Sequence, residues 1–140
     1  NKIANSGFSH VLNINIGAED DFYSEEIKDI LLSVLEKALS EIEPQSRRHD
    51  IVTNILRSNK HLGIREKKIE QLKQVLKSSS KMTPRVLQEL KGIGFEISED
   101  GKHYKLTYFG DARYTITLAK TPSDYRSGQN NISTIMKKVF

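Results

Sequence analysis

The sequence predicts an α+β protein in which an N-terminal helical region precedes an α-β-β-β-α module. Two periodicities support this class. Between Ser24 and Lys77 the apolar residues recur with helical spacing, whereas between Phe95 and Ala119 apolar and polar residues alternate in three short runs. Alternation of period two is typical of strands with one buried face. The module is therefore expected to contain a three-stranded antiparallel meander covered on one face by two helices.

Composition excludes several classes of protein. The 140 residues contain no cysteine, which rules out disulfides and thiolate metal sites. No apolar run approaches the roughly 20 residues that span a bilayer, and no signal segment begins the chain. We therefore expect a soluble, cytoplasmic protein without a membrane partner. The first residue is Asn1 rather than methionine, which is compatible with a piece of a longer protein.

Residues 1–22 are the hardest part of the chain to interpret. Apolar and polar residues alternate from Val11 to Ile16, which allows a strand, but no neighbouring segment offers a partner. We expect a poorly defined arm or an edge strand, or the remnant of a preceding domain.

Residues 23–79 are expected to form a small bundle of three helices joined by short connections. Ser24 can cap the first helix, and Pro44 ends it. The second helix starts at Ser46, and the third extends from about Ile64 to Lys77.

Residues 82–140 are expected to form the α-β-β-β-α module, after a serine-rich boundary at residues 78–80. Thr83 is placed to cap its first helix, with Pro84 at the first helical position. The strands carry three tyrosines, which we assign to the buried face of the sheet. These are Tyr104, Tyr108 and Tyr114.

The net charge of +4 is concentrated in the module. Residues 1–80 contain 12 basic and 12 acidic residues, whereas residues 81–140 contain 10 basic and 6 acidic ones. Positive charge confined to one module is typical of a protein that binds a polyanion. An ordinary solvated basic surface is the alternative.

The residue pattern points to few kinds of chemistry. The four histidines lie in four different predicted elements without paired ligand spacing, so we expect no metal and no cofactor. His103 is predicted on the polar face of the sheet between Lys102 and Lys105, where an imidazole could transfer a proton and lysines could hold a phosphate. It could equally be a polar strand residue. Lys120 and Arg126 flank the start of the last helix, where a phosphate contact or an ordinary capping loop is expected.

The segment LQELKGIGFEISEDGKHYKL and the element order of residues 82–140 resemble the HicA-type toxins. These are small mRNA interferases with a fold similar to the double-stranded RNA-binding domain. The match includes the entry into the first strand at Gly94-Phe95-Glu96 and the Gly101-Lys102-His103 motif. The resemblance implies that His103 corresponds to the catalytic histidine. Lys102 stands where the family typically has serine, and the helical region and the KTPSDYRSGQNN loop are further departures.

We therefore hypothesise a bacterial RNA-binding, HicA-like module, belonging to a larger protein or a toxin–antitoxin-type system. The helical region would serve for docking a protein partner or for self-association. One alternative is an active mRNA interferase that uses His103 as general base, and another is a non-catalytic protein–protein interaction domain. The residues expected to contact RNA are Lys102, His103, Lys105, Arg113, Lys120 and Arg126.

Overall fold

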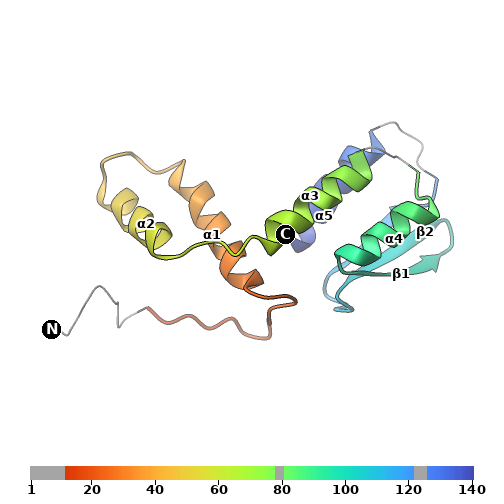
Figure 1. Ribbon diagram of the computed structural model, residues 1–140, viewed down its shortest axis with the longest axis horizontal. Coiled ribbons are helices and arrows are strands. Elements are labelled where there is room, and N and C mark those ends of the chain that lie inside the picture. Colours follow the sequence, from red (N-terminus) through yellow and green to blue (C-terminus); the bar gives the residue numbers. More distant parts are fainter. Residues whose placement is uncertain (1–11, 78–80, 122–125) are drawn as a thin grey trace.

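The computed structural model describes residues 12–77, 81–121 and 126–140. Within them the chain is α+β, with four helices before a three-stranded antiparallel sheet and one helix after it, which confirms the predicted fold class (Figure 1). The elements are α1 (Glu26–Leu39), α2 (Arg47–Ser58), α3 (Ile64–Lys77), α4 (Pro84–Ile93), β1 (Phe95–Asp100), β2 (His103–Tyr108), β3 (Thr115–Ala119) and α5 (Ser127–Val139).

The sheet has the order β1-β2-β3, with β2 in the centre. Leu106 of β2 lies opposite Ile97 of β1 and Ile116 of β3. Leu106 and Tyr108 are buried, whereas Lys105 is exposed and Thr107 is half-buried, as the alternation predicts. The three tyrosines assigned to the buried face belong to the core or pack against it.

Three helices pack with this sheet around one apolar core. Helix α4 packs against β1, α5 packs against β3, and α3 packs against both α4 and α5. Leu72 and Leu76 of α3 are therefore buried in the same apolar core as Phe95 and Leu106. The division of the chain at residues 78–80 stays a prediction, because these residues lie outside the described part. The third helix, which that division assigns to the bundle, shares its core with the module.

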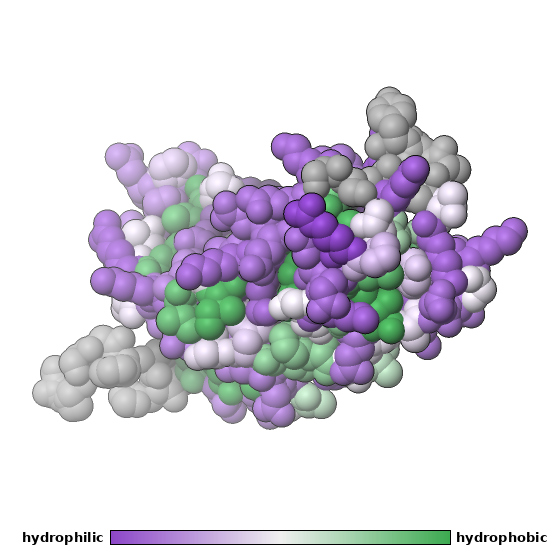
Figure 2. All heavy atoms as spheres, turned by 45° about the vertical axis from the view of Figure 1, so that its right-hand side comes forward, coloured by the Kyte–Doolittle hydropathy of each residue, from purple (hydrophilic) through white to green (hydrophobic). Residues whose placement is uncertain are grey.

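Helices α1 and α2 form an arm beside this core (Figure 1). Leu32 is the buried apolar residue of α1, and α2 buries none of its residues. Large apolar side chains therefore remain exposed here, and Figure 2 shows that apolar patches interrupt an otherwise hydrophilic face. Exposed apolar residues of this arm and of the connection to α3 are Leu31, Val34, Ile51, Ile55 and Leu62.

The start of α1 differs from the prediction. Ser24 does not cap the helix: Asp21 accepts the N–H of Ile27 at 2.7 Å, and Glu26 accepts the N–H of Phe22 at 2.8 Å. Two carboxylates thus satisfy backbone donors at this helix end, where the helix dipole also favours negative charge. The consequence is a fixed Phe22, whose ring stacks on Phe109 with 5.3 Å between the ring centroids.

Residues 12–22 form no strand, so an edge strand is absent from this part of the predicted arm. The first residue of the predicted strand, Val11, lies outside the described residues. Within the described ranges, no helix combines the length and the apolar character that crossing a membrane would require.

Candidate nucleic-acid interface

The turn between β1 and β2 brings three of the predicted contact residues together. Gly101 has a φ of +60°, a left-handed conformation that glycine adopts without strain. Lys102 lies in the turn, His103 begins β2, and Lys105 follows two residues later on the same face of the strand. All three are exposed. The predicted face is thus open and basic at this end of the sheet.

The imidazole of His103 is exposed beside this turn. In the sheet, His103 lies opposite Asp100 on one side and Ala119 on the other. No hydrogen bond or ion pair joins its ring to the described residues. A general base is usually held in its reactive orientation by a second group. The arrangement therefore leaves His103 accessible to a ligand without an orienting partner.

Lys120 joins the same end of the sheet through the backbone. Its N–H donates to the carbonyl oxygen of Lys102 at 2.9 Å. Its ammonium group donates to Glu99 Oε1 at 2.6 Å and lies 5.2 Å from the centroid of the Tyr104 ring. The hydrogen bond and charge of Lys120 lower the pKa of the Glu99 carboxyl. Lys120 thus forms an ion pair with Glu99 on the helix-covered side of the sheet.

Helix α4 begins at this end, because it leads into β1 through a reversal at Gly94 and runs back along that strand (Figure 1). Helix α5 follows β3, and in Figure 1 its N-terminal end lies above the sheet. Each N-terminus contributes a partial positive charge of about half a unit. Arg85 lies in the first turn of α4, and Arg126 precedes α5. We call this end, with Arg85, Lys102, His103, Lys105, Lys120 and Arg126, the hairpin end.

Arg85 was missed by the sequence-based reasoning. It is exposed, and its guanidinium lies 3.6 Å from Glu89 one turn along the helix. Its position could have been inferred from topology, because a helix that packs antiparallel to β1 must begin where β1 ends.

Arg113 does not join the hairpin end. It lies in the β2–β3 connection, at the opposite end of the sheet. Its guanidinium donates to Asp111 Oδ2 at 2.7 Å and to Glu19 Oε2 at 2.9 Å. The bond to Asp111 raises the pKa of Arg113, and the same bond lowers the pKa of Asp111. Two carboxylates therefore compensate this charge, which leaves Arg113 poorly placed for a phosphate shared with His103.

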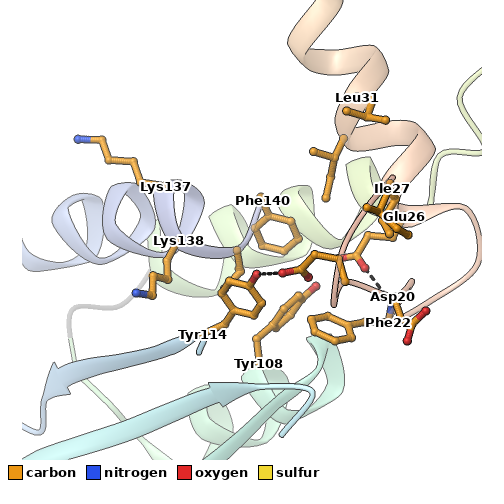
Figure 3. Close-up of a pocket in the computed structure, with 14 residues that line it drawn as sticks. Asp20, Phe22, Glu26, Ile27, Leu31, Tyr108, Tyr114, Lys137, Lys138 and Phe140 are labelled. Atoms are coloured by element: carbon orange, nitrogen blue, oxygen red, sulfur yellow. Dashed lines mark hydrogen bonds between the residues drawn. The ribbon is translucent and has the colours of Figure 1, made fainter. Parts of the chain in front are cut away.

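An apolar groove of about 430 Å³ opens at that opposite end, between the start of α1 and the end of α5 (Figure 3). Phe22, Tyr108 and Phe140 line it, while the ammonium groups of Lys137 and Lys138 point away from these rings. An aromatic lining of this kind suits apolar groups and offers little to phosphate.

One further cluster combines ligands that metals prefer. Among the described residues, Asp29, His61 and Glu66 bring carboxylate and imidazole atoms within 4.8 Å of one another. They belong to α1 and α3 and to the connection before α3, and not to the hairpin end.

The chain was compared with known proteins in three ways. No family model matches it, and neither the curated proteins nor the solved structures contain a match. The fold and the geometry of these residues are therefore the basis for a functional proposal.

Proposed function

We propose that the protein binds duplex RNA through the hairpin end, as a HicA-like module would. The observation that supports this proposal is the group of exposed basic residues Lys102, His103 and Lys105 at the end of the sheet where helix α4 also begins. Backbone amides and basic side chains are the groups that contact nucleic-acid phosphates. Duplex RNA is recognised mainly through its shape, its phosphates and its 2′-hydroxyls, which suits a surface without an aromatic stacking platform.

Binding of this kind should depend strongly on salt. Each phosphate that a lysine neutralises releases condensed counterions, so affinity falls as the salt concentration rises. Glu99 and Asp100 lie beside the hairpin end and oppose RNA binding there. We therefore expect measurable affinity at low salt and little sequence preference.

The test is a filter-binding titration of a short RNA duplex at several salt concentrations. The double variant Lys102→Gln/Lys105→Gln should lower the slope of log affinity against log salt by about 2, one per phosphate contact. Arg47→Gln/Arg48→Gln is the matched control, because it removes two exposed positive charges from α2. No binding at low salt, or an equal loss in both variants, would overturn the proposal.

RNA cleavage with His103 as general base is a separate alternative. It is supported by the exposed imidazole between two lysines, but no described residue orients that ring. Incubation of end-labelled RNA with the protein distinguishes the two. Cleavage that His103→Ala abolishes while affinity is kept would replace simple binding by nuclease activity.

The alternative of a protein-interaction domain is supported by the exposed apolar side chains of the α1–α2 arm, such as Val34 and Ile51. This alternative predicts self-association or partner binding that Val34→Lys weakens. It also predicts that Lys102→Gln/Lys105→Gln has no effect on RNA binding. Light scattering over a range of protein concentrations measures the first part.

A further inference from the structure

We propose that Asp29, His61 and Glu66 form a binding site for a divalent transition-metal ion of the zinc type. His61 Nδ1 lies 3.8 Å from Asp29 Oδ1 and 3.7 Å from Glu66 Oε2. Ligand atoms around tetrahedral zinc, each at about 2.0–2.1 Å from the ion, lie about 3.3 Å apart. His61 therefore needs to approach each carboxylate by only a few tenths of an ångström, and all three ligand atoms lie within 4.8 Å of one another.

The second ring nitrogen of His61 is already held as metal-binding histidines are held. His61 Nε2 lies 3.0 Å from Glu36 Oε1, where it can donate its hydrogen. A carboxylate in this position fixes the tautomer in which Nδ1 carries a lone pair, the arrangement found around bound zinc. Both His61 Nδ1 and Glu66 Oε1 are buried atoms without a hydrogen-bond partner. Buried polar atoms are seldom left in this state, so a missing partner is indicated.

Asp29 is fixed in place before any ion binds. Its side chain is only 2% exposed, and its oxygens accept the N–H of Leu62 at 3.1 Å and that of Gly63 at 2.9 Å. These bonds attach α1 to the connection before α3, so the carboxylate cannot rotate freely away from His61. The carboxylate is thus oriented by a rigid shell, as a metal ligand requires.

The charges around the cluster favour a dication. Lys28 lies 4.0 Å from Asp29 Oδ1, and Arg65 donates to Glu66 Oε2 at 3.1 Å. The carboxylates of Glu25, Asp29, Glu36 and Glu66 outnumber these two cations by two. A proton on His61 Nδ1 is the simpler alternative, but 3.7 and 3.8 Å are too long for hydrogen bonds to the neighbouring carboxylates.

The donor set suggests the ion and its role. One imidazole with two carboxylates suits zinc and neighbouring first-row dications better than Mg²⁺ or Ca²⁺, which prefer oxygen ligands alone. Asp29 belongs to α1 and Glu66 to α3. A bound ion would therefore fix the α1–α2 arm against the sheet-bearing core.

The experiment uses the full chain after treatment with a chelator. Isothermal titration calorimetry with Zn²⁺ should show one ion bound per chain. Addition of Co²⁺ should produce the visible absorption bands of a protein-bound cobalt ion. His61→Gln should abolish both signals, whereas Glu36→Gln should weaken Zn²⁺ binding about 10- to 100-fold, as loss of a supporting carboxylate does. His49→Gln is the control, because His49 lies in α2 near Thr53 and away from the cluster.

Circular dichroism checks that each variant is folded. If His61→Gln does not fold, Glu66→Gln replaces it, since the side chain of Glu66 is 42% exposed. Absence of Zn²⁺ binding by the wild-type chain would overturn the proposal. So would equal binding by the wild type and by a folded His61→Gln or Glu66→Gln variant, because the ion would then lie elsewhere.

Discussion

Replacing Leu72 by alanine tests whether α3 and the sheet share one core. Leu72 is completely buried in the cluster that includes Leu106 of β2. Deleting a buried leucine side chain costs about 3–5 kcal/mol, from lost apolar burial and from the cavity left behind. For a chain of this size we expect a fall in Tm of roughly 10 °C or more.

Hydrogen exchange of the Leu106 amide gives the sharper measurement. If α3 and the sheet unfold together, a loss of about 3–5 kcal/mol should lower the protection of this amide by about two to nearly four orders of magnitude. Leu31→Ala is the matched control, because it removes the same atoms from a side chain that is 45% exposed in α1. It should cost less than about 1 kcal/mol.

Unchanged protection of Leu106 in the folded Leu72→Ala variant would refute this reasoning. The helical region would then unfold separately from residues 82–140, and the packing of α3 on the module would contribute little to the stability of the sheet.

Two further predictions concern the backbone and a buried carboxyl. Gly94→Ala should destabilise the protein by about 1–3 kcal/mol in urea unfolding, because Gly94 has a φ of +135° and a Cβ at this position would lie 2.7 Å from Phe109 Cζ. Gly92→Ala is the control: no atom lies near its new Cβ, so this variant should be as stable as the wild type or more stable. Equal effects would contradict this. Burial raises the pKa of Glu26, as do Asp21 and Glu19, while the N–H of Phe22 and Lys68 oppose the shift. The protonated Glu26 carboxyl therefore contributes fully to the free energy of unfolding below about pH 4, and this contribution is lost as the pH rises through the folded-state pKa. Glu26→Gln should thus be more stable than the wild type at neutral pH but not at about pH 3. If the urea midpoints of the two proteins differ by the same amount at both pH values, this prediction is wrong.

Secondary structure could be predicted closely because its signals are local. The third helix was expected from about Ile64 to Lys77 and has those bounds, and Thr83 caps α4 as expected, with its side chain accepting the N–H of Val86. The start of α1 was predicted less well. Several polar residues compete to cap that helix, and Asp21, from outside it, supplies the bond that Ser24 was expected to make.

The candidate sites were harder to predict, because each depends on packing. Lys102, His103 and Lys105 are close in sequence and stay together on the strand. Arg113 was grouped with them because it was expected on the same polar face of the meander, but it lies at the other end of the sheet, where its guanidinium donates to Asp111. Charge alone does not reveal which cations have acidic partners.

The sequence by itself thus determined the number and order of these helices, the three strands and the polar and apolar faces of the meander, since periodicity acts over a few residues. Only the tertiary structure decided that α3 packs into the core of the module, because an apolar stripe does not specify what covers it. It also brought Asp29 within 3.8 Å of His61, which lies 32 positions further along the chain, through bonds from Asp29 to the backbone of Leu62 and Gly63. The spacing of these residues in the sequence does not predict this contact, because the contact depends on the path of the connection between α2 and α3.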